Sequence, residues 1–213
     1  MSTPIIILGT RTLAVELADV ISEIPGIEVM AFVENLERNR CQEPLEGLPV
    51  LWVDELAEQA GQVQAICGLA TTQRWQYVEQ VRALGVTFAT LRHPTARVSR
   101  TAELGDGCFI SPFANVSTRT VLGAQVFLNR GVLVGHHTRI GDYCTVQPGA
   151  NIAGSVTIGE RTYIGMGAIV RDNVTIGAGC VIGAGAVVTK DLPDHVLALG
   201  LPASIVQTGI EGK

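Results

Sequence analysis

Aliphatic residues recur at every sixth position through the second half of this chain. The series runs without a gap through Val98, Leu104, Ile110, Val116, Leu122, Leu128, Val134, Ile140, Val146, Ile152, Ile158, Ile164, Val170, Ile176, Ile182 and Val188. The next residue is often glycine, and the fifth position of most hexads is small or β-branched. Neither an α-helix nor an alternating hairpin strand has a six-residue period. The pattern predicts a parallel β-helix over 98–193, in which three hexads complete one coil of a triangular prism.

The first half follows a different pattern, in which apolar strands alternate with amphipathic helices. Strands are predicted over 4–9, 28–34, 64–69 and 86–91, and helices over 10–24 and 72–85. This alternation predicts an α/β, Rossmann-like domain over 1–91 with a small parallel sheet. Residues 92–97 then form a linker to the β-helix, and residues 194–213 form a C-terminal tail.

Ligands of such sheets bind beyond the carboxyl ends of the strands. The candidate substrate-binding residues there are Gly9, Thr10, Arg11, Glu34, Asn35, Gly68 and Thr71. A complete G-x-G-x-x-G is absent from the sequence, so a dinucleotide fingerprint is not supported. The alternative is that the first domain is only a structural cap on the prism.

Composition narrows the range of partners. The chain of 213 residues has a net charge of −5, which does not suit a nucleic-acid binder. It contains no stretch expected to enter a membrane, and its five cysteines form no CxxC pair, so a cytoplasmic protein without disulfides is expected. Cys108, Cys144 and Cys180 share the inward fifth position of their hexads and are expected to be core residues.

Two adjacent histidines, His136 and His137, occupy the third and fourth positions of one hexad, at an outward corner of the prism. They could be surface residues without a role, metal ligands, or a catalytic base with its neighbour. Zinc of the kind held by related β-helices needs three histidines. The corresponding positions one coil away hold Thr118 and Arg119 on one side and Gly154 and Ser155 on the other. We therefore expect no metal site.

The interpretation as a base gains from Gly154, which follows His136 by eighteen residues and so lies one coil further along, roughly 4.8 Å away. Its backbone N–H could stabilise a developing oxyanion. A base beside such a donor suits acyl transfer without an acyl-enzyme. A cysteine nucleophile is the alternative chemistry, but the cysteines of the β-helix are expected to point inward.

Several stretches together carry a family resemblance: "LPVLWVDEL" (48–56), "LRHPTARVS" (91–99), "VGHHTRIGDY" (134–143), "IAGSVTIGERTYIGMGAIV" (152–170), "IGAGAVVTKDLP" (182–193) and "GLPA" (200–203). The chain resembles the bacterial sugar O- and N-acetyltransferases, which include sialic-acid O-acetyltransferase-like proteins and the nucleotide-sugar N-acetyltransferases of bacillosamine and perosamine synthesis. The resemblance implies a left-handed β-helix and a homotrimer, with acetyl-CoA between neighbouring prisms. The acceptor it implies is a sugar or nucleotide-linked sugar.

The resemblance also assigns roles by position. His136 falls on the catalytic base, and His137 stands where the family has an acidic neighbour that orients it. Thr145 replaces a second family histidine that contacts the acetyl group or cofactor, and Gly154 donates its backbone N–H to the acetyl carbonyl. The other expected cofactor contacts are Met166, Gly183, Ala184 and Lys190, of which Lys190 could instead be a solvated end-cap residue. The alternative to transfer onto an amine or hydroxyl is a catalytically silent trimeric sugar-nucleotide-binding or scaffold protein.

Overall fold

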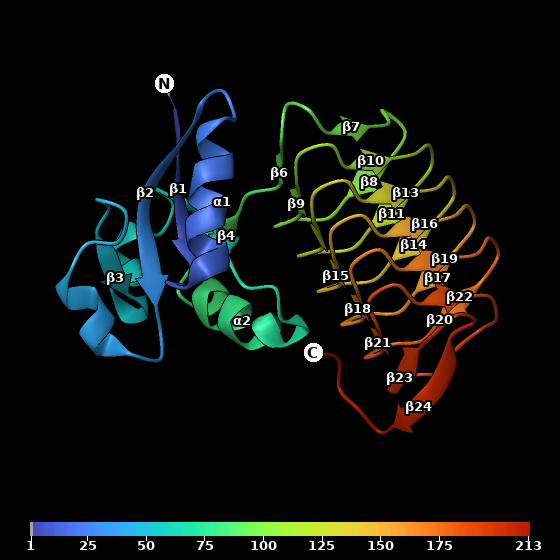
Figure 1. Cartoon of the computed structure of the whole chain (residues 1–213). Coiled ribbons are helices and arrows are strands. Elements are labelled where there is room, and N and C mark those ends of the chain that lie inside the picture. The colour runs from blue at the N-terminus through green and yellow to red at the C-terminus, as the bar shows by residue number, and fades with distance from the viewer. Residues whose placement is uncertain (1) are drawn as a thin grey trace.

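The computed structural model describes residues 2–213 as an α/β domain packed against a prism of stacked coils (Figure 1). The first domain holds a parallel sheet in the order β3-β2-β1-β4-β5. Its elements are β1 Thr3–Leu8, α1 Thr12–Ser22, β2 Ile27–Glu34, η1 Arg38–Gln42, β3 Val50–Trp52, η2 Val53–Gln59, β4 Gln64–Cys67, η3 Thr72–Arg74, α2 Trp75–Ala83 and β5 Thr87–Phe88. No helix within 2–213 is long and apolar enough to cross a membrane.

Strand β1 lies at the centre of the sheet, between β2 and β4. Consecutive side chains of a strand point to opposite faces of the sheet. Ile5 and Ile7 pack with α1, whereas Ile6 and Leu8 pack in the cluster that includes residues of α2. The strand is therefore apolar at four successive positions, as expected for a parallel sheet covered on both sides. The predicted parallel sheet is confirmed, although both helices are shorter than predicted.

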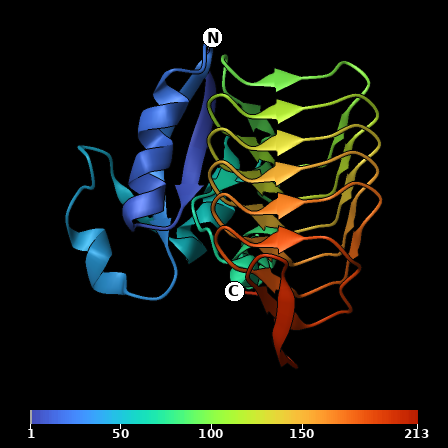
Figure 2. The same ribbon diagram turned by 45° about the vertical axis from the view of Figure 1, so that its right-hand side comes forward.

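The predicted β-helix is confirmed, and its two-residue strands form three flat faces (Figure 2). The β6 face holds β6 Leu91–Arg92, β9 Phe109–Ile110, β12 Phe127–Leu128, β15 Thr145–Val146, β18 Tyr163–Ile164, β21 Val181–Ile182, β23 Val196–Leu199 and β24 Ser204–Thr208. The β7 face holds β7 Arg97–Val98, β10 Asn115–Val116, β13 Leu133–Val134, β16 Asn151–Ile152, β19 Ile169–Val170 and β22 Val187–Val188. The β8 face holds β8 Glu103–Leu104, β11 Val121–Leu122, β14 Arg139–Ile140, β17 Thr157–Ile158 and β20 Thr175–Ile176.

Parallel pairing along each face has an offset of eighteen residues from β6 to β22, and the offset falls to sixteen where β23 joins β21. Position 1 of each hexad therefore stacks on position 1 of the coil before it, and nearly all of these aliphatic side chains are buried in one continuous core. Cys108, Cys144 and Cys180 are buried in the same core as free thiols, as expected. Burial raises the pKa of Cys108 and of Cys144 to about 12, so neither is suited to act as a thiolate nucleophile.

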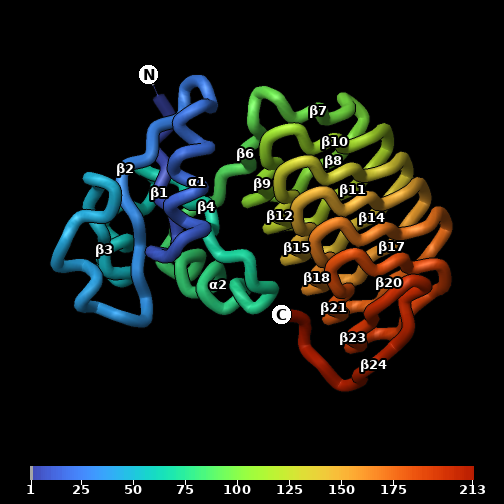
Figure 3. The backbone as a smooth tube through the Cα atoms, viewed as in Figure 1, coloured from blue at the N-terminus to red at the C-terminus, as the bar shows by residue number. Residues whose placement is uncertain are grey.

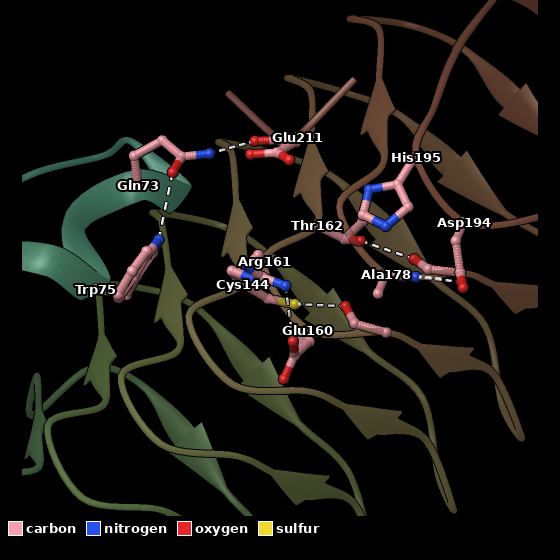
Figure 4. Close-up of polar contacts among 12 residues, drawn as sticks. Gln73, Trp75, Cys144, Glu160, Arg161, Thr162, Ala178, Asp194, His195 and Glu211 are labelled. Atoms are coloured by element: carbon pink, nitrogen blue, oxygen red, sulfur yellow. Dashed lines mark hydrogen bonds and ion pairs between the residues drawn. The ribbon is translucent and has the colours of Figure 1, made fainter. Parts of the chain in front are cut away.

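The prism extends beyond the predicted boundaries at both ends (Figure 3). A single strand over 86–91 is wrong, because β5 ends in the first sheet and β6 pairs with β9 of the prism. The expected linker 92–97 thus begins and ends within strands. The expected tail adds β23 to the β6 face, and β24 turns back antiparallel to it. Beyond β24 the chain reaches the first domain, where Gln73 donates a hydrogen bond to the carbonyl oxygen of Glu211 (Figure 4).

The first domain sits on the β6 face, and Arg74 is the polar centre of that contact. Its guanidinium is 2% exposed and donates to the Oγ1 of Thr145 at 2.7 Å and to the carbonyl oxygens of Gln125 and Cys144 in the prism. It also donates to the carbonyl oxygen of Thr71 at 2.7 Å. Burial lowers the pKa of Arg74. No carboxylate within residues 2–213 forms an ion pair with it. The buried charge is stabilised by carbonyl and hydroxyl dipoles alone.

Arg74→Met should cost about 3–5 kcal/mol in the free energy of unfolding, because it leaves buried hydrogen-bond acceptors without a donor. Arg82 of α2 is the matched control. It also connects the first domain to the prism, through Asp106 at 2.7 Å, but it is partly exposed. Arg82→Met should cost about 1 kcal/mol or less. Urea unfolding of both variants measures the two values, and equal costs would contradict this account of Arg74.

Candidate active site

His136 and His137 lie in the turn that joins the β7 face to the β8 face, which we name the His136 corner. Both side chains are exposed, as expected for the third and fourth positions of the hexad. The two Nδ1 atoms are 3.0 Å apart, and the rings meet edge to face with their centroids 5.2 Å apart. At least one of the two nitrogens must carry a proton for this contact to be a hydrogen bond. The pair is thus in contact, and neither ring is part of the core.

Gly154 lies directly against the imidazole of His136, one coil further along the corner. A Cβ atom built on Gly154 would lie 2.6 Å from the Cε1 of His136 and 2.7 Å from its Nε2. Only a glycine leaves room for the ring in this position. The backbone N–H of Gly154 has no acceptor within residues 2–213. A proton acceptor and an unused N–H donor therefore lie side by side on the surface.

A cavity of about 300 Å³ opens at the carboxyl ends of β1, β2 and β4 in the first domain. Six of the seven predicted substrate-binding residues line it: Gly9, Thr10, Arg11, Glu34, Asn35 and Thr71. They converge because the carboxyl ends of parallel strands meet at one edge of the sheet. Gly68 is the exception. It is buried where a Cβ would meet Ala14 and Ile7 at 2.9 Å, so its role is close packing of β4 against α1.

Glu34 organises one wall of this cavity. Its carboxylate accepts hydrogen bonds from the hydroxyl of Thr10 and from three backbone N–H groups, including that of Leu36 at 2.8 Å. Burial raises its pKa, but the hydrogen bonds from Thr10 and the backbone outweigh burial and leave the pKa below its ordinary value. Glu34 is therefore an ionised residue that holds the loop after β2 in place.

Residues of η3 and α2 complete the cavity, and they are not among the substrate-binding residues predicted from the sequence. Gln73, Gln76 and Gln80 present amide groups, and Tyr77 lies beside them with a buried hydroxyl that has no partner among the described residues. The spacing of the glutamines along the helix was the available signal, since positions three, four and seven apart share one face.

The predicted cofactor residues fall into two rows. Lys190 is exposed in the last turn of the His136 corner, which is two residues shorter than the earlier turns because Leu192 pairs with Ile176. Met166, Gly183 and Ala184 lie instead at the corner that joins the β6 and β7 faces, which we name the Met166 corner. Met166 is 57% exposed and Ala184 is exposed, whereas Leu199 packs against Gly183. The two rows border opposite edges of the β7 face.

The prediction that Thr145 contacts the acetyl group or cofactor is wrong. Thr145 is fully buried on the β6 face, and its hydroxyl accepts the hydrogen bond from Arg74. The first domain covers it, so it stabilises the contact between domains and cannot touch a cofactor at either exposed corner. The described residues also contain no group of three or more His, Cys, Asp or Glu side chains placed to hold a metal ion.

The hexad β-helix places this chain in the class of hexapeptide-repeat proteins. The sequence family of bacterial hexapeptide transferases matches residues 119–154 and 155–190. No curated protein matches the sequence.

Solved structures that resemble nearly the whole chain include the following three. PerB from Caulobacter crescentus, in complex with CoA and GDP-perosamine, is 31% identical over 96% of this chain and 97% of its own, with a TM-score of 0.87. The acetyltransferase domain of PglB from Neisseria gonorrhoeae, in complex with acetyl coenzyme A, is 28% identical over 97% and 100%, with a TM-score of 0.89. WeeI from Acinetobacter baumannii is 26% identical over 96% and 100%, with a TM-score of 0.87. The chain belongs to the hexapeptide-repeat sugar acetyltransferase family and is an acyltransferase.

Glu34→Gln should destabilise the protein at neutral pH by about 1–2 kcal/mol, because the charged acceptor of several hydrogen bonds is lost. The native pKa of Glu34 is lowered, so this contribution is complete above the unfolded glutamate value of about 4.3 and is lost as the pH falls through the native pKa. Thermal unfolding from neutral to acid pH should therefore show the two proteins converging.

Glu28→Gln is the control, because Glu28 is exposed at the other end of the same strand. It should change stability little at any pH. A difference between wild type and Glu34→Gln that stays constant down to acid pH would show that the carboxylate charge is not responsible.

Proposed function

We propose that this enzyme transfers the acetyl group of acetyl-CoA to an amine or hydroxyl of a nucleotide-linked sugar, with His136 as general base. The observation that carries the proposal is the contact between the His136 ring and Gly154, whose N–H is free. The neighbouring structures support the substrate classes, since they hold CoA or acetyl-CoA and, in PerB, GDP-perosamine.

The two groups divide the work of a direct transfer. His136 takes the proton of the attacking amine or hydroxyl through Nε2 as the new bond to the acetyl carbon forms. The N–H of Gly154 donates to the acetyl carbonyl oxygen as negative charge develops there. The bond from carbon to sulfur then breaks, and the proton held by His136 passes to the leaving sulfur, so that CoA departs as the thiol. No cysteine of the prism takes part, because their thiols are buried.

Acetyl-CoA would lie along the prism axis. Lys190 is three coils beyond His136 in the same corner, which is about 14 Å at one strand spacing per coil. An acetyl group beside His136 would then leave the phosphates within reach of Lys190. Met166, Gly183 and Ala184 border the other edge of the β7 face, so a neighbouring prism would bring its own Met166 corner to the same cleft.

The acceptor would bind in the cavity of the first domain, which we propose to be a Rossmann-like sugar-nucleotide site. Arg11, Asn35 and Thr71 provide polar groups there, while Thr10, Glu34 and Gly68 maintain its shape. This cavity belongs to the domain on the β6 face, whereas His136 lies where the other two faces meet. One chain therefore cannot bring its own cavity to its own base, and a second copy must supply one of them.

A homotrimer would meet that requirement. The β7 face carries the outward side chains Leu133 and Ile169, which are 44% and 47% exposed, and Met166 stands at its edge. Exposed apolar side chains along one flat face mark an association surface. Closed symmetry of order three repeats the same contact between a cavity and a base at every interface.

His136→Ala should lower kcat/KM by about 10²–10⁴-fold while leaving the fold intact. The assay follows release of the CoA thiol with acetyl-CoA and a panel of nucleotide-linked amino sugars, starting with GDP-perosamine. The variant should keep the thermal stabilisation by acetyl-CoA, since it retains the cleft. Undiminished activity would remove His136 from the mechanism. A wild-type protein that acetyl-CoA does not stabilise would favour a silent scaffold instead.

Mixing two inactive variants tests whether the site is shared. Gln80→Trp should fill the cavity from an exposed helix position, and His136→Ala removes the base. Coexpressed in equal amounts, the two should recover about a quarter of wild-type activity, because each site then draws its cavity and its base from different chains at random. Sedimentation should give a trimer for both variants. No recovery in confirmed mixed trimers would place cavity and base in one chain.

A further inference from the structure

The turn that carries the two histidines leaves them little freedom, because the ladder of the β-helix fixes their backbone. The backbone N–H of His137 donates to the carbonyl oxygen of Thr118 at 3.0 Å, and the carbonyl oxygen of His136 accepts from the backbone N–H of Ser155 at 2.8 Å. His137 has a φ of 58°, close to the values of Arg119 and Ser155 at the same position of neighbouring coils. The left-handed backbone is thus imposed by the coil, and it turns His137 toward His136.

We propose that His137 is a positioning residue: its Nδ1 accepts a hydrogen bond from the Nδ1–H of His136 and thereby leaves the Nε2 of His136 free of a proton. The inference rests on the proposed function, in which His136 is the base. A neutral imidazole carries its proton on one nitrogen only. The hydrogen bond to His137 keeps the proton of His136 on the Nδ1 of His136. The unprotonated Nε2 of His136 then lies against Gly154, where the proton of the attacking amine or hydroxyl has to be taken up.

The two rows of this corner hold no carboxylate within one coil of the pair. Thr118 and Arg119 precede the pair, Gly154 and Ser155 follow it, and Asp172 and Asn173 come one coil later. The nearest carboxylate in the His136 row, Asp172, is thus two coils away.

A neutral acceptor has a different effect from a carboxylate. A hydrogen bond to an ionised acceptor is roughly twice as strong as one between neutral groups. His137 therefore fixes the tautomer of His136 while stabilising its protonated form less than a carboxylate would.

The tautomer can be measured without any assay of activity. In ¹⁵N-histidine-labelled protein at a pH where both rings are neutral, the Nδ1 of His136 should have the chemical shift of a protonated ring nitrogen and the Nε2 that of an unprotonated one. His137 should show the opposite pattern. In His137→Phe, which removes the acceptor, His136 should revert toward the Nε2–H tautomer that free imidazole side chains favour in water. An Nε2–H tautomer of His136 in the wild type would overturn the proposal.

Three substitutions of His137 separate positioning from a merely structural role. His137→Asn should keep at least about a tenth of wild-type kcat/KM, because asparagine tolerates the left-handed backbone and its Oδ1 can accept the same hydrogen bond. His137→Phe should lose about 10–100-fold, chiefly in kcat. His137→Asp should remain active, because its carboxylate can accept the same hydrogen bond.

Equal activity of the phenylalanine and asparagine variants would overturn the proposal. If no acceptor is acetylated although the ¹⁵N shifts show the expected tautomers, the proposed function fails while the hydrogen-bond assignment stands.

Discussion

The stacking of aliphatic side chains at an eighteen-residue offset is the constraint on which the rest of this structure depends. It places every position of the hexad above its equivalent in the coil before, so the corners become straight rows of residues spaced by one strand separation. His136 and Gly154 lie in one such row for this reason alone. A shift of the register by one residue would turn the aliphatic positions outward and scatter the row.

The second constraint is the contact between the first domain and the β6 face. Phe109 and Phe127 stack with centroids 5.6 Å apart under that domain, and Arg74 anchors the polar part of the contact. Because the first domain covers the β6 face, the β7 and β8 faces of the prism remain uncovered. The same contact explains the burial of Thr145, which a position-by-position comparison with the family had assigned to the cofactor.

The turn that carries the two histidines separates backbone geometry from side-chain chemistry. The coil holds the fourth position of the turn in a left-handed conformation in Arg119, His137 and Ser155 alike, so the backbone sets the direction of the side chain. The residue type then decides what that side chain can do, and at position 137 it is a second imidazole within hydrogen-bonding distance of His136.

The sequence by itself determined the β-helix, the position of its cysteines, the outward placement of the histidine pair and the pairing of His136 with Gly154. All of these follow from a period that any hexad repeat must satisfy. The candidate cavity was also predicted in outline, because carboxyl ends of parallel strands converge. Only the tertiary structure decided that Arg74 is buried without a carboxylate, that Thr145 is covered, and that cavity and base lie on different sides of one chain. These depend on how two separately patterned domains pack against each other, and local periodicity contains no information about that contact.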